Sequence, residues 1–449
     1  MELSGFRCAD PRLSSAHRAR PRHSKFALRW LRRGLLTALL VVAVVLPLRA
    51  ASGPLTSAQG WVAALIDSPA AFYTPNPAFT PGFEMGLYQG TNVLATASAP
   101  HDAKLKSAAA AVVPLCQNGN PPSGSCAEGG AGKIGVAHIG FSVSIQQTCT
   151  GPNHANGLVA PTPSACATGT ADYTLYQDQQ GATPTIAPTV YFADCAQPSA
   201  TMDKWAAQIG INSQTTAPYW YNCVNTVLPN EGLVANQIEA VTIEAAAGSP
   251  SAGFSSMSSL SHTPCQAGDE ATVAACYGEQ QTGIVLRELF QQWPHLKIAY
   301  LYSRAYGGCA AAGTLNPEPY AYEDGFTVQF LIQAQIRQAD NNGPQDSEAG
   351  NLAYSVVPAL SWGGYQWANG TTPNSEGLSW PCTDFTTTDQ THFVNGGYQN
   401  SANTMINFFL GTSVTGANHQ AYTGWIRPNG ATPAPTASST PTMLFSFHR

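Results

Sequence analysis

Five short runs of apolar and β-branched residues recur along the chain, and segments with helical periodicity lie between or after them. Such runs predict strands, and strands that alternate with helices favour parallel βαβ units. The sequence therefore predicts an α/β fold built on a parallel sheet. The strands are expected at residues 133–139, 189–193, 238–243, 296–302 and 352–359, and the clearest helices at 282–293, 321–338 and 401–410.

The N-terminal region has the layout of a secretory signal. Residues 1–33 carry nine Lys/Arg against two acidic residues and lead into an uncharged apolar run at 35–48. That run is short for a membrane-spanning helix, which needs roughly 20 residues, and small residues suitable for cleavage follow it at 50–53. We therefore expect a secreted protein, extracellular or periplasmic, with an uncleaved N-terminal anchor as the alternative and the only attachment to a membrane.

The charge and the cysteine content limit the kinds of partner and site that this chain can have. Residues 51–449 hold 10 Lys/Arg and 24 Asp/Glu, so the chain has no electrostatic footprint for nucleic acid. Ten cysteines follow the leader, and an even number in an exported chain favours disulfides over a thiol site. The absence of a CxxC pair disfavours structural zinc, and we predict neither metal nor cofactor. Spacing leaves the connectivity open and suggests, mostly from nearest neighbours, Cys116–Cys126, Cys149–Cys166, Cys195–Cys223, Cys265–Cys276 and Cys309–Cys382.

The part of the chain after the leader is expected to form a single folded domain. About 400 residues exceed the usual size of one compact domain, yet no long linker divides them. Gly, Pro, Ser and Thr are spread throughout, which predicts long, disulfide-pinned loop insertions in one α/β core. The expected boundaries are 1–52 for the leader and signal peptide or anchor, 53–427 for the folded domain, and 428–449 for a disordered tail.

The nucleotide-binding motifs lack the structural context that they need. The aromatic segments leave two interpretations open. Residues 130–135 match G-x-G-x-x-G but precede the first predicted strand, and Lys133 is followed by Ile134 instead of the Ser or Thr of a P-loop. Aromatic stretches at 219–221 and 362–367 could stack on sugar rings or could simply pack in the core and loops.

A serine, an aspartate and a histidine occur in a nucleophile-and-base order. Ser142 follows the first predicted strand after a break at Gly140, and Asp389 and His392 lie three residues apart in a late loop. A serine hydroxyl is a weak nucleophile until an imidazole accepts its proton, and a carboxylate orients that imidazole and stabilises its charged form. Ligands bind beyond the carboxyl ends of parallel strands, and Ser142 lies at one such end, where it could meet a substrate. An Asp and a His at this spacing also recur by chance.

Five segments between residues 133 and 410 together carry a family resemblance. They are residues 139–142 after the first strand, Ala196-Gln197 after the second, the segments 302–308 and 316–323, and Asp389-Gln390-Thr391-His392 before the last helix. With these segments the chain resembles a bacterial secreted subgroup of the SGNH (GDSL-like) hydrolase superfamily. The resemblance implies a three-layer α/β/α, flavodoxin-like fold. It also implies that Ser142 is the nucleophile, His392 the base and Asp389 its orienting acid.

The chain departs from this family mainly where an oxyanion would be bound. Phe141 replaces the Asp of Gly-Asp-Ser, and Pro198-Ser199 stands where the family has a glycine whose N–H donates, although proline has no N–H. The family's third-block asparagine would follow the third strand, but Glu244 and three alanines lie there. Losing one donor typically costs about 10²–10³ in rate. We therefore expect a weak enzyme unless Gln197 or Ser199 helps to bind the oxyanion or substrate.

Two functions follow from these observations. The first is a secreted serine esterase that hydrolyses an O-acyl ester, on a small acyl ester or an acylated glycan, through an acyl-enzyme intermediate. The alternative is a catalytically impaired protein of the SGNH fold that binds carbohydrate or another surface ligand. The retention of all three triad candidates in order favours the esterase.

Overall fold

The computed structural model describes residues 99–149, 166–248, 265, 267–310, 317–318, 320–340, 342–374, 376–411 and 422–428. The leader, its apolar run and the tail after residue 428 lie outside the described residues, so the expectations for them stay predictions. Within the described ranges, no helix combines the length and apolar character needed to cross a membrane.

Within this described part, five parallel strands form one sheet in the order β2-β1-β3-β4-β5. This is the order of flavodoxin-like doubly wound sheets, in which the chain changes direction between β1 and β3 and ligands bind beyond the carboxyl ends of these strands. The predicted α/β class with a parallel sheet is confirmed. The strands are β1 (Ile134–Ile139), β2 (Val190–Asp194), β3 (Ile238–Glu244), β4 (Ile298–Tyr302) and β5 (Ala359–Trp362).

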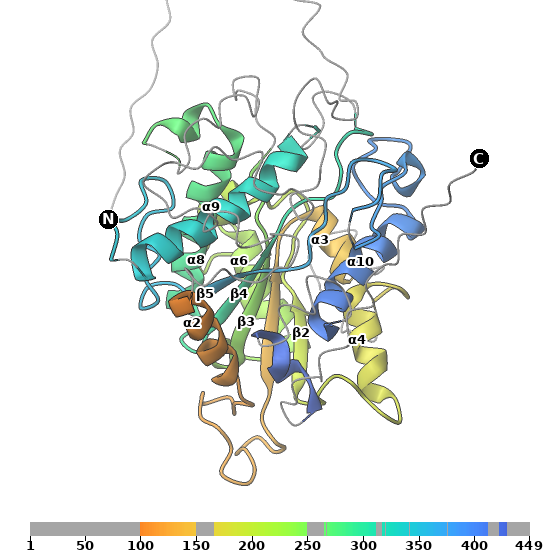
Figure 1. Ribbon diagram of the computed structural model, residues 1–449. Helices are drawn as coiled ribbons and strands as arrows, with labels where there is room; N and C mark the ends of the chain where they lie inside the picture. Colours follow the sequence, from red (N-terminus) through yellow and green to blue (C-terminus); the bar gives the residue numbers. More distant parts are fainter. Residues whose placement is uncertain are drawn as a thin grey trace, which may run out of the picture. The chain divides into compact units, whose positions relative to one another are not determined.

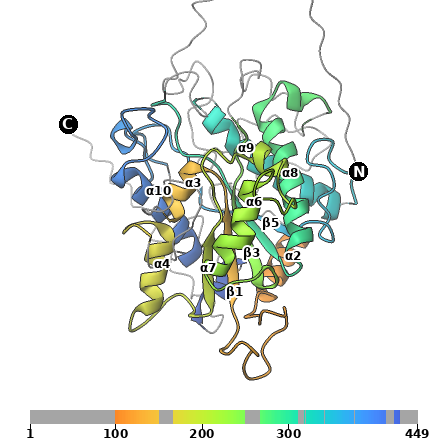
Figure 2. The same cartoon turned by 180° about the vertical axis from the view of Figure 1, so that it is seen from behind.

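Helices cover both faces of the sheet, because alternate strand residues are buried on opposite sides. Ile139, Ile243 and Leu301 belong to one core, and Val136 and Tyr300 to the other. The two opposite views show α2 and α10 over one face and α6 and α8 over the other (Figures 1 and 2). The first core contains residues of α5 (Met202–Ala206), α6 (Pro218–Asn222), α8 (Ala274–Gln292) and α9 (Tyr320–Asp340), and the second contains residues of α2 (Ala99–Ala110), α4 (Ala171–Gln180) and α10 (Asn395–Leu410).

Several short helical segments connect these elements. The most consequential is α3 (Ser142–Thr148), which begins three residues after the end of β1. The others are α7 (Leu228–Asn230), a π-helix at Cys223–Val227, and 3₁₀ turns at Ala235–Gln237, Asp269–Ala271, Cys382–Asp384 and Gly424–Ile426.

The strand predicted at residues 352–359 is wrong, because β5 begins only at Ala359. The N–H groups of Val356 and Val357 both donate to the Ala353 carbonyl, so the backbone turns there. Pro358 has no N–H to offer a sheet. The Gln335 side chain of α9 instead bonds to the carbonyl of Pro358 at 2.9 Å. The apolar pattern of this run therefore reflects burial of a turn.

Two predicted helices begin earlier than expected. The helix predicted at 282–293 begins at Ala274, and the one predicted at 401–410 begins at Asn395. Both missed segments contain glycines, which lower helix propensity. A Cβ at Gly278 would press on the Thr327 side chain, and one at Gly397 would overlap the Asp384 carbonyl. Close packing against a neighbouring segment thus explains residues that weaken the helical pattern.

All five predicted disulfides are present, and they join the ten cysteines that follow the leader. Four close loops of 10 to 28 residues. The fifth, Cys309–Cys382, spans 73 residues. It joins the segment after β4 to the segment that precedes Asp389 and His392 in the chain. A framework of this density is typical of proteins that mature in an oxidising compartment.

We predict that removal of the Cys309–Cys382 disulfide destabilises the protein more than removal of Cys116–Cys126. The cysteines are 73 and 10 residues apart, and loop-closure entropy gives about 4 and about 3 kcal/mol respectively. Urea unfolding of the two double Cys→Ser variants measures both losses. A larger loss for the shorter loop would contradict the entropic ranking.

Candidate active site

The turn that carries Ser142 is fixed at Gly140. The Gly140 carbonyl accepts the backbone N–H of Gln197 at 3.2 Å and the indole N–H of Trp205 at 3.1 Å. A Cβ at position 140 would overlap the Ser144 hydroxyl, so only glycine fits. The turn at Gly140 therefore fixes the backbone direction between β1 and α3, which begins at Ser142.

A buried carboxyl supports the first turn of α3. The Phe141 N–H donates to Ser144 Oγ at 3.3 Å, and the Ser144 hydroxyl donates to the Glu244 carboxyl. Glu244 is the last residue of β3. Burial raises the pKa of Glu244 to about 7, although Arg304 and the Ser144 bond act against this rise. The Glu244 carboxyl is therefore committed to the helix of Ser142.

The structure brings together Ser142, His392 and Asp389, which the sequence had singled out. Ser142 Oγ lies 2.8 Å from His392 Nε2, and His392 Nδ1 lies 2.8 Å from Asp389 Oδ2. The histidine and aspartate side chains are 30% and 36% exposed, so the imidazole is reachable from solvent. Because a carboxylate accepts the proton on Nδ1, Nε2 is left to accept the proton of Ser142. This arrangement can activate a serine nucleophile.

Asp389 is held by the backbone and side chains of its own loop. Its Oδ1 accepts the Thr386 hydroxyl at 2.7 Å, the Thr391 N–H at 2.9 Å and the His392 N–H at 3.0 Å. Burial alone would raise the pKa of Asp389, but these hydrogen bonds and that from the imidazole hold it well below its usual range. Gln390 adopts a left-handed φ of 51° between Asp389 and the two N–H groups. The carboxylate is therefore ionised and fixed in direction.

The base of this loop is a small hairpin on an aromatic cluster. Phe385 and Phe393 form an antiparallel bridge, and the Thr386 N–H donates to the His392 carbonyl at 2.7 Å. Phe393 stacks on Trp380 with ring centroids 5.1 Å apart, and Phe385 packs on Phe393 at 5.5 Å. All three aromatic residues are buried. The position of His392 is thus coupled to a packed core.

The two oxyanion candidates lie in the turn after β2. Gln197 is buried, and its backbone N–H is used by the Gly140 carbonyl. Ser199 is exposed and has a left-handed φ of 62° in a turn closed by the Ala200 N–H on the Gln197 carbonyl. Their turn is tied to the turn that carries Ser142, but within the described part neither side chain is hydrogen-bonded to Ser142, His392 or Asp389. Their role stays a prediction.

The aromatic stretch at 362–367 is core. Trp362, Tyr365 and Trp367 are all buried, and the Trp367 indole N–H donates to Glu318 at 2.7 Å. These rings are therefore unavailable for stacking on a sugar. In the stretch at 219–221, Trp220 is buried and the two flanking tyrosines are half-buried.

Sequence reasoning missed three residues that organise this site. They are Ser144, Thr386 and Gln146, whose side chain bonds to the backbone of Phe393. Ser144 and Gln146 lie within four positions of Ser142, and Thr386 lies three before Asp389, but their partners are not visible in a sequence pattern.

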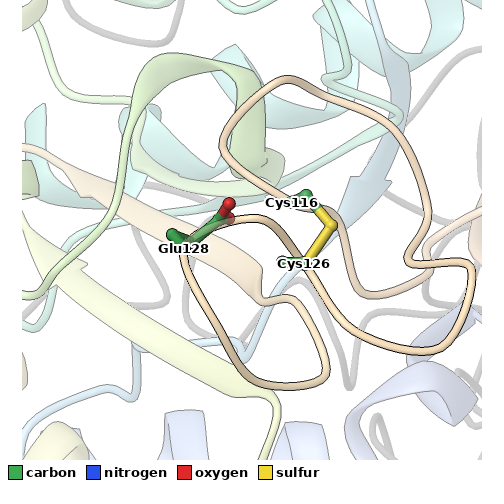
Figure 3. A group of neighbouring side chains, drawn as sticks. All are labelled: Cys116, Cys126 and Glu128. Atoms are coloured by element: carbon green, nitrogen blue, oxygen red, sulfur yellow. A yellow bond between two sulfur atoms is a disulfide. The ribbon is translucent and has the colours of Figure 1, made fainter.

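Figure 3 shows the one close group of metal-ligating residue types in the described ranges, Cys116, Cys126 and Glu128. The two sulfurs are bonded to each other, so they offer no thiolate ligand. The Glu128 carboxylate accepts the Gln117 N–H at 2.6 Å. This group is a pinned loop and not a metal site.

No family model, no curated protein and no solved structure matches this chain. The functional argument therefore depends on the geometry of the site.

We predict that Asp389→Asn slows the reaction of Ser142 with a fluorophosphonate by about 10³–10⁴, because the amide favours the wrong imidazole tautomer. Asp384→Asn is the matched control, since Asp384 lies at the base of the same loop and bonds to Asn400 at 2.9 Å, away from the imidazole. Its labelling rate should stay near that of the native protein. Equal loss in both variants would show that the loop, and not the carboxylate, limits the reaction.

Proposed function

We propose that this protein is a serine hydrolase of the SGNH type that cleaves an O-acyl ester. The observation that supports the proposal is the continuous hydrogen-bonded line from Ser142 through His392 to Asp389, with both distances at 2.8 Å. Ser142 follows β1, beside the β1/β3 switch point where ligands of such sheets bind.

The proposed reaction has two steps. In acylation, Ser142 Oγ attacks the ester carbonyl while His392 Nε2 takes its proton, and Asp389 stabilises the resulting imidazolium. His392 then gives this proton to the departing alcohol, which leaves an acyl-enzyme. In deacylation, His392 takes a proton from water, the hydroxide attacks the acyl carbon, and the proton returns to Ser142 as the carboxylic acid leaves.

The oxyanion would be bound by fewer donors than in the family. The Ser142 N–H belongs to the first residue of α3 and has no intrahelical acceptor, so it is available. Glu244, in place of the asparagine, is engaged with Ser144. We therefore propose a slow enzyme in which Ser199 supplies the second donor.

We also propose a compartment and a substrate class. Five disulfides and the signal-like leader support secretion. An exported serine esterase would meet small acyl esters and acylated glycans. For the alternative of a non-catalytic carbohydrate binder, burial of the aromatic residues at 362–367 removes one of the two aromatic stretches that supported it.

The central test is Ser142→Ala. The change should abolish hydrolysis of a small activated ester and covalent labelling by a fluorophosphonate, because both need the Ser142 oxygen. Circular dichroism should show an intact fold, since Ser142 is only half-buried and the change removes a single small hydroxyl, which is hydrogen-bonded to His392. Unchanged hydrolysis and labelling in the variant would end the serine mechanism and favour the binding alternative.

We also predict that Ser199→Ala or Gln197→Ala lowers kcat more than it raises KM. A donor that acts on the developing oxyanion contributes to the transition state alone, and removing one costs about 10²–10³. Steady-state kinetics on the activated ester separate the two parameters. A rise in KM at constant kcat would place the changed residue in substrate binding instead.

A further inference from the structure

Gln146 links the helix of Ser142 to the loop of His392. It lies four residues after Ser142 on α3, so both side chains are on the same face of that helix. Its amide makes two hydrogen bonds to one distant residue. Gln146 Nε2 donates to the Phe393 carbonyl at 3.1 Å, and the Phe393 N–H donates to Gln146 Oε1 at 2.8 Å.

The hairpin leaves the Phe393 backbone in need of these partners. The bridge between Phe385 and Phe393 is flanked by bonds from Thr386 to His392 and from Val394 to Asp384. In such a pair, the N–H and C=O of the two facing residues point away from each other. Phe393 is 3% exposed, and a buried backbone group without a partner costs about 1–3 kcal/mol. The Gln146 amide satisfies both groups as a neighbouring strand would.

We propose that Gln146 is a positioning residue that sets the distance between Ser142 and His392. The inference rests on the proposed hydrolase function. Ser142 and Gln146 share one short helix, and His392 and Phe393 are consecutive in the chain. The catalytic contact and the amide pair therefore join the same two segments at adjacent points, across about 250 positions of sequence.

The geometry explains why the catalytic contact would suffer without this pair. Local bonds hold Asp389 and His392 to each other within the loop, but they do not hold the loop to α3. A displacement of about 1 Å at a reacting group can cost about 10²-fold in rate. Gln146 is thus expected to act on the Ser142–His392 distance and to leave the His392–Asp389 pair intact.

The next residue provides a matched control. Gln147 is buried, and its Nε2 donates to the Ser401 carbonyl of α10 at 3.2 Å. It has the same chemistry and comes from the same helix, but its side-chain hydrogen bond goes to α10, whereas that of Gln146 goes to the loop of His392. Loss of this bond should reduce stability without moving the imidazole.

The test compares Gln146→Met and Gln147→Met in the full chain. Methionine keeps the length of glutamine and removes both hydrogen-bonding groups. Gln146→Met should lower kcat on an activated ester by about 10- to 100-fold and change KM less than about threefold. Gln147→Met should keep kcat within about threefold of the native value. If Gln146→Met does not fold, Gln146→Glu, which keeps the acceptor for the Phe393 N–H but loses the donor, should show the same fall in kcat at neutral pH.

A second readout does not depend on turnover. The imidazole nitrogen NMR shifts of His392, assigned with a His392→Asn variant, report its hydrogen bond to Ser142 at Nε2. Gln146→Met should change the Nε2 shift as Ser142→Ala does, and Gln147→Met should leave it unchanged. A native Nε2 shift and native kcat in Gln146→Met would overturn the proposal. So would equal losses of kcat in the two methionine variants.

Failure of the proposed function would look different. If the native protein neither hydrolyses esters nor reacts with a fluorophosphonate, the hydrolase assignment fails. The Nε2 shift still shows whether Gln146 positions the imidazole. If the native protein is active and Gln146→Met changes neither kcat nor the Nε2 shift, only the positioning role of Gln146 fails.

Discussion

The site depends first on the missing side chain at Gly140. A Cβ there would overlap Ser144, and the Gly140 carbonyl is fixed by Gln197 and Trp205. This one turn sets the start of α3 and joins it to the loop after β2 and to α5. The direction in which Ser142 leaves the sheet is therefore determined by close backbone packing, as is expected where a strand passes sharply into a helix.

The loop that carries Asp389 and His392 has its own internal hydrogen bonds and aromatic packing. Hydrogen bonds to Asp389 and the stacking of Trp380, Phe385 and Phe393 give the loop its internal geometry. The Cys309–Cys382 disulfide and the Gln146 amide connect that loop to the rest of the fold. Preorganisation of this kind lowers the entropic cost of holding the His392 and Ser142 side chains in contact.

A buried acid, Glu244, supports the first turn of α3 through Ser144. Burial raises the pKa of the Glu244 carboxyl to about 7. Because this pKa lies above the ordinary value of 4.5, folding favours the neutral acid. Its contribution to stability is complete below about pH 4.5 and is lost as the pH rises through about 7. The first turn of α3 is therefore supported best under mildly acidic conditions.

The sequence by itself determined the elements whose signal is local. Four of the five strands and the parallel class could be predicted from patterns of a few residues. Nearest-neighbour spacing suggested the disulfide pairs without fixing them, and the order of Ser142, Asp389 and His392 suggested which side chains would meet. Tertiary structure alone decided the rest. The run before β5 is a turn, the aromatic stretch at 362–367 is core, and Gln146 pairs with a residue 247 positions away, because each of these outcomes depends on which distant segment fills the adjacent space.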